Sequence, residues 1–138
     1  MACREFFVDL LGHEDHGCLL ILELGDERLD HWLEKGICDE SDFKEIAWSL
    51  FAALEWLHMR GLAHLDVKPE NVMRFEGRWK LIDLECCMAL DDGEFVSMGD
   101  LTPLYASPEV AKAILGGMPI RPSAAMDIWA AGVPRRAA

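Results

Sequence analysis

The sequence is poor in positive charge. Its 138 residues hold 13 lysines and arginines against 25 aspartates and glutamates, a formal net charge of -12 at pH 7. Proteins that bind nucleic acid or an anionic membrane do so largely through clustered positive charge. We therefore expect neither nucleic acid nor a membrane as a partner. Residues 1–60 carry fourteen acidic and five basic residues, so an anionic ligand is expected to bind the second half of the chain.

Cysteines and long apolar runs are also scarce. Five cysteines, two of them adjacent, do not form the even and regularly spaced set that is typical of a secreted disulfide framework. No uncharged apolar run approaches the ~18 residues of a membrane span, and the first residues do not read as a signal peptide. The sequence therefore predicts a soluble, cytoplasmic protein without a cleaved signal or a membrane span.

The composition that is present fits a single folded domain, with 51% hydrophobic and 28% charged residues. Two short apolar runs, 5–11 and 18–24, flank a polar stretch of turn-forming residues and predict a β-hairpin. Residues 27–35 predict a short helix, because the pattern stops at Gly36, a residue that commonly terminates helices.

A longer helix is expected between Ser41, a residue type that caps helix N-termini, and Gly61. Between them apolar side chains recur every three or four residues, so they lie on one face of the helix. We expect this face to pack in the core. It consists of Phe43, Ile46, Ala47, Leu50, Leu54 and Leu57.

Beyond this helix the pattern changes to that of strands and loops. Two short strands, 72–75 and 79–82, predict a second hairpin that turns at a Glu-Gly pair. Residues 86–107 show little periodicity and predict a long loop, and residues 109–115 predict a short helix. Helices combined with short hairpins predict an α+β fold.

The most informative stretch is 64–71, which reads His-Leu-Asp-Val-Lys-Pro-Glu-Asn and is followed by a carboxylate at the end of a predicted strand. Phosphoryl transfer to a hydroxyl requires a carboxylate that accepts the hydroxyl proton and a cation that neutralises the transferring group. It also requires oxygen ligands that hold Mg²⁺ against the phosphates. These groups are supplied, in that order, by Asp66, Lys68, Asn71 and Asp83.

The order and spacing of these residues resemble those of the protein kinase family, whose catalytic loop reads H-R-D-L-x-x-x-N and whose metal-binding motif reads D-F-G. Residues 102–109 resemble the family's segment that ends in A-P-E, and residues 127–132 resemble its D-x-W-x-x-G helix start. The resemblance implies a partial α+β fold of the protein kinase type. It places a small-lobe hairpin and hinge in residues 1–26, and a large-lobe portion with catalytic loop and activation segment in residues 27–138.

The resemblance also implies an activity, which is ATP-dependent phosphorylation of Ser or Thr in protein substrates with Mg²⁺ as cofactor. Asp66 would act as the catalytic base, and Lys68 would contact the transferred phosphate. Asn71 and Asp83 would bind the Mg²⁺ ion of the nucleotide. Lys68 and Thr102 together match the serine/threonine pattern of the family rather than its tyrosine pattern.

Further positions are implied to bind adenine or to hold the loops. The resemblance places the adenine-binding strand and hinge, with the apolar floor beneath the base, at Leu22, Glu23, Leu24, Gly25 and Met73. It places the activation-segment residues and the structural anchors at Thr102, Tyr105, Glu109, His64 and Asp127. Of these anchors, the aspartate would hold the backbone of the catalytic loop.

The sequence departs from the family's pattern at two motif positions. Leu65 stands where the family has the arginine that links the catalytic loop to a phosphorylated activation loop, so we expect no switching by such a phosphate. Glu85 stands where the family has the glycine of D-F-G. It adds a charge and removes backbone freedom beside the metal ligand, so we expect an effect on the metal geometry.

The resemblance covers only part of the family's domain. The chain contains no G-x-G-x-x-G segment and no V-A-I-K-like strand. We therefore expect a domain that is truncated at both ends and is weakly active or inactive by itself. We also expect exposed apolar surface along the 43–57 helix and around Trp129, which would promote self-association.

Two other classes of protein fit parts of the pattern. A small-molecule phosphotransferase of the aminoglycoside kinase type shares the H-x-D-x-x-x-x-N loop, but it is not expected to carry Lys-Pro-Glu at 68–70 or the segment 105–109. A pseudokinase or scaffold fragment, which would bind partners without turnover, is favoured by Glu85 and by the expected truncation. Both classes remain alternatives to an active protein kinase.

Some histidines and cysteines invite a metal or redox interpretation. His13, His16 and Cys18 have a spacing that could suggest zinc, but a polar hairpin turn explains them and no partner cluster lies nearby. Cys86 and Cys87 are expected to be ordinary loop thiols, since no flanking cation lowers their pKa.

Overall fold

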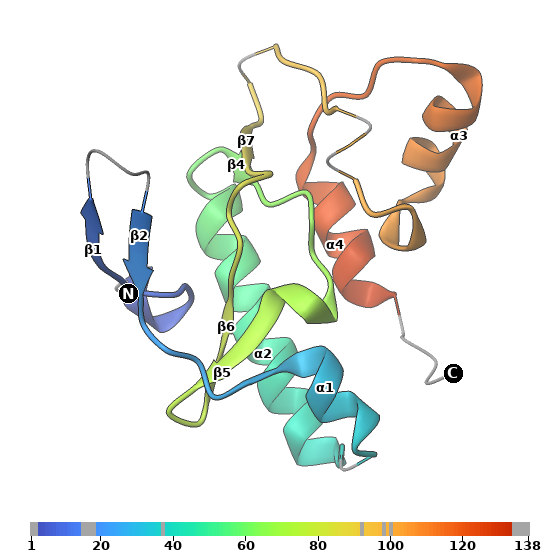
Figure 1. Cartoon of the computed structure of the whole chain (residues 1–138). Helices are drawn as coiled ribbons and strands as arrows, with labels where there is room; N and C mark the ends of the chain where they lie inside the picture. Colours follow the sequence, from blue (N-terminus) through green and yellow to red (C-terminus); the bar gives the residue numbers. More distant parts are fainter. Residues whose placement is uncertain are drawn as a thin grey trace. The chain divides into compact units, whose positions relative to one another are not determined.

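A computed structural model of the chain describes residues 3–14, 19–36, 38–91, 93–97, 99 and 101–133. Its contacts divide the chain into two compact units, and Figure 1 labels their α-helices and most of their strands. The first unit consists of Met1–Ala53 and Pro69–Ile82, and the second unit consists of Leu54–Lys68 and Asp83–Ala138. Helix α2, Glu40–His58, begins in the first unit and ends in the second.

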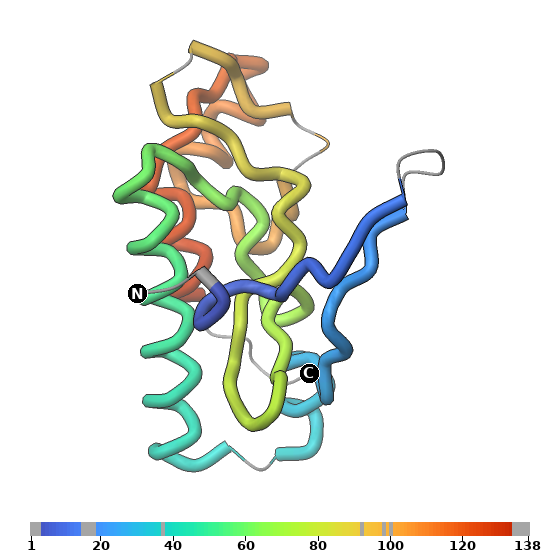
Figure 2. The backbone as a smooth tube through the Cα atoms, turned by 90° about the vertical axis from the view of Figure 1, so that its left-hand side faces the viewer, coloured from blue at the N-terminus to red at the C-terminus, as the bar shows by residue number. Residues whose placement is uncertain are grey.

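Antiparallel strands form most of the first unit. Strands β1, Leu10–Glu14, and β2, Leu19–Leu22, pair as a hairpin, and their backbones run side by side in Figure 2. A three-stranded sheet has the order β3-β5-β6, with bounds Glu27–Arg28, Val72–Phe75 and Arg78–Leu81. Both hairpins expected from the sequence are therefore present.

The first hairpin begins later than its apolar pattern predicts. The sequence predicted a first strand at 5–11, but Phe6 and Phe7 follow a short 3-10 helix and precede β1. Both rings are buried, and the Phe6 carbonyl accepts a hydrogen bond from the Leu81 N–H at 2.9 Å. The two rings thus serve the core beside β6, and the strand starts only beyond them. Residues 15–18, where the expected turn falls, lie outside the described residues.

The second hairpin turns at Glu76 and Gly77, between β5 and β6. Both residues have positive φ, 48° and 81°, as the favoured two-residue hairpin turn requires. Glycine adopts this conformation without a steric cost, which explains Gly77, whereas Glu76 adopts it at a cost. The turn aligns Phe75 with Arg78 and Val72 with Leu81.

Helix α1, Leu29–Glu34, packs against β3 and β5. The sequence predicted a helix over 27–35, but the first two of these residues form β3 and pair with β5 instead. The Trp32 ring lies edge-on to the Trp79 ring, with 5.6 Å between the ring centroids. Gly36 follows the helix with a φ of 69°, as expected for a helix terminator.

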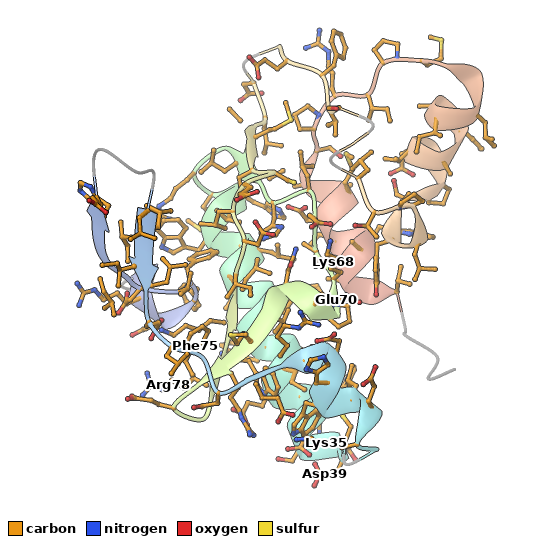
Figure 3. The ribbon with its side chains drawn as sticks, viewed as in Figure 1. Lys35, Asp39, Lys68, Glu70, Phe75 and Arg78 are labelled. Carbon is orange, nitrogen blue, oxygen red and sulfur yellow. The ribbon has the colours of Figure 1, made fainter. Side chains whose placement is uncertain are left out.

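Helix α2 begins before the residue that the sequence predicted as its cap. The Asp42 N–H donates to Asp39 Oδ1 at 2.9 Å, and the Asp39 N–H donates to Asp42 Oδ2 at 3.2 Å. This reciprocal pair is a capping box, so Asp39, labelled in Figure 3, is the cap. The prediction of Ser41 was wrong because an aspartate two positions earlier has a partner three residues further on.

The buried face of α2 is narrower than its apolar stripe. Ile46, Leu54 and Leu57 are buried as expected, but the Phe43 side chain is 65% exposed. Trp48, which lies outside the stripe, is 71% exposed. The stripe therefore overestimates the core at the start of the helix, because periodicity does not tell which turns other segments cover.

The second unit contains short helices and a small sheet. Strand β4, Leu62–Ala63, pairs with β7, Met88–Ala89. The helices η3, α3 and α4 span Pro103–Tyr105, Pro108–Gly116 and Ala124–Gly132. Strand β7 and helix η3 thus lie within the stretch that the sequence predicted to be a loop, since two-residue pairings and single turns leave no periodicity to detect.

The core of the second unit is apolar and combines residues of β4, α3 and α4 with residues of the loops between them. It consists of Ala63, Leu65, Val96, Val110, Ile120 and Met126. Short antiparallel sheets combined with helices make an α+β fold, as the sequence predicted. Among the described residues, no helix has the length and apolar character that crossing a membrane requires.

The cap of α2 gives a testable prediction. Asp39→Ala is expected to lower the free energy of unfolding by about 1 kcal/mol, because the Asp42 N–H loses its acceptor. Urea unfolding followed by circular dichroism measures the change. Ser41→Ala is the matched control, and it should change the free energy by less than about 0.5 kcal/mol. Equal destabilisation by the two substitutions would contradict the assignment of the cap.

Candidate functional site

The loop that carries the predicted base is buried. Residues 64–67 follow β4 in the second unit, and all four are shielded from solvent. Buried backbone N–H groups need hydrogen-bond partners in place of water. The partners of the first two residues come from a single side chain on α4.

That side chain is Asp127, in the first turn of α4. Its Oδ2 accepts the His64 N–H at 2.8 Å, and its Oδ1 accepts the Leu65 N–H at 2.8 Å. The Nε2–H of His58 also donates to Oδ2, at 2.8 Å. Asp127 is only 1% exposed, so these bonds take the place of its hydration. The structure thereby brings the two predicted anchors, Asp127 and His64, together.

The loop turns sharply at Leu65. This residue has a φ of 67°, in the left-handed region that few residues other than glycine adopt. Its side chain is buried in the core beside Val110 and Met126. Directly after it, the Asp66 N–H donates to Nδ1 of His64 at 3.2 Å. Burial and hydrogen bonds together offset the strain of the turn.

The turn places the predicted base in a cluster with two other side chains. The Lys68 Nζ, on a residue labelled in Figure 3, lies 2.6 Å from Asp66 Oδ2. The Thr102 hydroxyl donates to Asp66 Oδ1 at 2.7 Å, and the Lys68 Nζ donates to the Thr102 hydroxyl at 3.2 Å. A carboxylate can accept a proton from a hydroxyl, and an ammonium can neutralise a phosphoryl group. The cluster therefore holds two of the groups that phosphoryl transfer requires.

The predicted activation-segment residues lie in different surroundings. Tyr105 is buried in η3 and lines a small cavity together with Asp66 and Thr102. Glu109, by contrast, is exposed in α3 and lines an apolar groove that includes Trp129. Thr102 and Tyr105 are thus brought to the base, and Glu109 is not.

The predicted metal ligands belong to different units. Asp83 follows β6, is exposed and has a φ of 61°, and its Oδ1 accepts the Glu85 N–H at 3.4 Å. Asn71 is buried in η2, Pro69–Asn71, and its carbonyl accepts the Ile82 N–H at 2.8 Å. Carboxylate and amide oxygens are ligands that Mg²⁺ accepts. The donor types at both positions therefore fit the predicted ion.

The predicted adenine segment continues from β2 in the first unit. Leu22 ends the strand, and the Leu24 side chain is 94% exposed. A Cβ atom at Gly25 would come within 2.1 Å of Met73 Sδ, so only glycine allows this close approach. The structure thus brings the predicted hinge and the predicted apolar floor together.

Two partners of these residues were not predicted from the sequence. His58 bonds to Asp127 across 69 positions, and Lys80 bonds to Glu23 across 57 positions. Separations of this size leave no local signal of pairing. The one available hint was a lysine between the apolar residues of β6, because buried lysines almost always have a partner.

Metal ligation and thiol reactivity were two further interpretations of the sequence. No group of three or more His, Cys, Asp or Glu side chains within the described part of the chain could hold a metal ion. His16 and Cys18 of the considered zinc set lie outside the described residues. Burial, followed by the charge of Asp127, raises the pKa of the Cys87 thiol to about 12. This direction favours the protonated thiol at neutral pH, which fits the expectation of an ordinary loop thiol at Cys87.

Known proteins resemble the chain in sequence. A model of the protein kinase domain matches residues 3–134. The chain is 32% identical over 108 residues to SNF1-related protein kinase catalytic subunit alpha KIN12 of Arabidopsis thaliana, a match that covers 78% of this chain and 21% of the relative. It is 28% identical over 126 residues to the carbon catabolite-derepressing protein kinase of Candida tropicalis, covering 91% of this chain and 20% of the relative. The chain thus spans about a fifth of the length of these relatives.

Removal of the buried carboxylate should release the loop. Asp127→Ala leaves the N–H groups of His64 and Leu65 without an acceptor, at a cost of about 1–3 kcal/mol for each group. Their amide protons should exchange with solvent at least about tenfold faster, as measured by nuclear magnetic resonance. Asp91→Ala, at an exposed aspartate, is the matched control. Unchanged protection of both amides in a folded Asp127→Ala variant would contradict the anchoring role.

Proposed function

Because the chain belongs to the protein kinase domain family and has an α+β fold consistent with part of that domain, we propose that it serves ATP-dependent phosphoryl transfer to Ser or Thr of protein substrates. The observation that carries the proposal is the cluster of Asp66, Lys68 and Thr102, with contacts of 2.6, 2.7 and 3.2 Å. It unites an acceptor for a hydroxyl proton with a cation for the phosphoryl group.

Each member of the cluster has a distinct role in this proposal. Asp66 accepts the proton of the substrate hydroxyl as the hydroxyl oxygen attacks the phosphorus of the terminal phosphate of ATP. The bond from that phosphorus to the bridging oxygen breaks, and ADP leaves. Lys68 neutralises the charge that is spread over the phosphoryl oxygens in the transition state. Thr102 orients the Asp66 carboxylate through its 2.7 Å hydrogen bond. Asp127 acts on the reaction indirectly, since it fixes the backbone that precedes the base.

The nucleotide and its metal ion are assigned to the remaining predicted positions. Asn71 and Asp83 would hold Mg²⁺, which supplies neutralisation of the phosphate charge when it is bound. Residues 22–25 would pair with the edge of adenine through their backbone groups, and Met73 would pack beneath the ring. The close approach of Gly25 to Met73 supports this assignment, because it joins a polar edge to an apolar floor.

The division of the chain and the substrate class complete the proposal. Residues 1–26 are assigned to a small-lobe hairpin and hinge, and residues 27–138 to a large-lobe portion with the catalytic loop and activation segment. The hydrogen bond from Lys68 to Thr102 supports Ser or Thr as the accepting residue, because both belong to the serine/threonine pattern. Family membership supports a protein rather than a small molecule as the substrate.

A scaffold without turnover is the second candidate. Its specific support is Glu85, which stands where the family has the glycine two residues after the predicted metal ligand Asp83. Glu85 adds a negative charge and restricts the backbone beside that ligand, which would disturb the binding of Mg²⁺. A chain with weakened metal binding would still be able to bind partners while transferring little phosphate.

The activity is best tested in a version of the chain that is extended with a Gly-rich strand pair and a lysine-bearing strand. The 138 residues contain neither, so we expect them to be weakly active or inactive alone. In the extended protein, Asp66→Asn should lower phosphate transfer to a Ser/Thr peptide by roughly 10²-fold or more, because an amide does not accept the proton. Asp91→Asn, an exposed aspartate outside the cluster, should leave transfer unchanged.

The outcomes separate the two candidates. Equal turnover by the Asp66→Asn variant and its parent, with both folded, would remove the assigned base. An extended parent that folds but binds Mg²⁺ weakly and transfers no phosphate would favour the scaffold. Recovery of transfer on Glu85→Gly would then identify the replaced glycine as the cause.

Self-association of the chain is also part of the proposal. Trp48 and Phe51, three residues apart on one face of α2, are 71% and 43% exposed. Trp129 on α4 is 46% exposed and lines an apolar groove with Ile128. Exposed apolar patches of this kind promote association, and a second copy of the chain is the proposed occupant.

Sedimentation velocity over a range of concentrations should therefore detect dimers or larger species. Trp48→Gln should shift the distribution toward monomer, because it removes apolar surface without changing the net charge. Glu45→Gln, an exposed residue on the same helix, is the matched control and should not favour the monomer. A compact monomer at every concentration would contradict the proposal.

A further inference from the structure

The first unit contains a buried lysine that no role assigned above requires. Lys80 lies in the middle of β6 and is 8% exposed. Its Nζ lies 2.5 Å from Glu23 Oε1 and 5.1 Å from the centroid of the Phe75 ring, a residue labelled in Figure 3. A buried ammonium is tolerated only when it is paired and hydrogen-bonded. The position of Lys80 is therefore tied to that of Glu23.

Glu23 in turn holds two segments of backbone together. Its Oε1 accepts the Asp9 N–H at 2.8 Å as well as the Lys80 bond. Its own N–H donates to the Asp9 carbonyl at 3.0 Å, so the two residues are joined by a pair of bonds where the β1–β2 hairpin ends. Glu23 lies directly after β2 and two residues before Gly25. The ion pair thus connects β6 to the segment 22–25.

Lys80 also lies opposite the residue assigned to the floor of the adenine site. In the ladder of β5 and β6 its direct partner is Met73. Directly opposed residues of paired strands point to the same face of the sheet. Lys80 therefore contacts the predicted hinge through its side chain, and its backbone is paired with Met73 of the predicted floor. Gly25 packs on the side chain of that methionine.

We propose that Lys80 is a positioning residue for adenine binding, which sets the backbone of residues 22–25 above Met73 by holding the Glu23 carboxylate. The inference rests on the proposed function, because it takes the hinge and the floor from it. The role is indirect, since the ammonium is engaged by Glu23 rather than by the nucleotide. A hinge that is held in place before the ligand arrives spends less binding energy on ordering, and so binds more tightly.

The electrostatics of the pair are consistent with a fixed charge. Burial raises the pKa of the Glu23 carboxyl, but the hydrogen bond from Lys80, the Asp9 N–H and the positive charge of Lys80 together lower it below its ordinary value. Glu23 therefore carries a full negative charge at neutral pH. The Glu23 side chain is only partly shielded from solvent, at 23% exposure. Removal of the lysine would leave its charge without a partner, so the side chain and its backbone would move toward water.

Adenosine is a suitable probe, because it reaches the hinge and the floor without involving the phosphate or metal positions. The 138-residue chain, labelled with ¹⁵N, is titrated with adenosine, and the backbone N–H signals of residues 22–25 report binding. Three variants are compared with the parent chain, namely Lys80→Met, Lys80→Arg and Glu23→Gln. Lys35→Met is the matched control, because Lys35 pairs with Glu27 at the same 2.5 Å distance at a site that is half exposed.

The expected result is a specific loss of affinity. Lys80→Met and Glu23→Gln should each weaken adenosine binding by about fivefold or more. Combining them should cause little further loss, because both remove the same interaction. Lys80→Arg should restore part of the affinity, and Lys35→Met should leave it unchanged. In the Lys80→Met variant the amide proton of Asp9 should exchange faster with solvent, because Glu23 is less well ordered. The amide protons of β5 should exchange at the same rate as in the parent chain.

Two different results would overturn the inference, and they are distinguishable. A parent chain that binds adenosine at residues 22–25, with Lys80→Met and Glu23→Gln variants that bind equally well, removes the role of Lys80 but leaves the proposed function intact. A parent chain without any shift at residues 22–25 removes the assigned hinge, and the positioning role with it. If Lys80→Met does not fold, Glu23→Gln decides, because its amide oxygen still accepts the Asp9 N–H.

Discussion

The loop around Asp66 depends on one buried carboxylate. Asp127 accepts the N–H groups of His64 and Leu65, and a third hydrogen bond from His58. A carboxylate in the interior is costly unless it is fully hydrogen-bonded, and buried backbone N–H groups are costly for the same reason. The carboxylate from helix α4 and the backbone N–H groups of the loop therefore supply each other's hydrogen bonds. Without these bonds the burial of either group would be costly. The left-handed backbone of Leu65 persists because these bonds hold it.

The need of shielded polar groups for partners also explains how the charged side chains are paired in each unit. Asp66 follows the anchored backbone directly and is shielded from solvent, so its carboxylate is found with the Lys68 ammonium and the Thr102 hydroxyl. In the first unit, the buried Lys80 ammonium donates a hydrogen bond to the Glu23 carboxylate. In each case the exclusion of water makes a specific partner necessary. The residues proposed for catalysis and for adenine binding are thus held in place by charged groups that need partners because water is excluded from them.

Local patterns in the sequence were sufficient for several features that depend on neighbours along the chain, although they led to Ser41 instead of Asp39 as the cap of α2. Asp66 and Lys68 are two residues apart, so their motif implied a shared location that the structure shows. The hairpin turn with Gly77 and the helix end at Gly36 follow from backbone preferences of single residues. The order of the motifs also indicated the family, which the match to the protein kinase domain model confirms.

The sequence by itself thus determined the family, the α+β class, both hairpins and the local spacing of the predicted base and its lysine. Only the tertiary structure decided that Phe43 is exposed within an apolar stripe. It also decided the pairing of Lys80 with a glutamate 57 positions away. Periodicity and motifs describe a residue's relation to its neighbours in the chain. Burial and long-range pairing depend on segments that approach one another only in the folded protein.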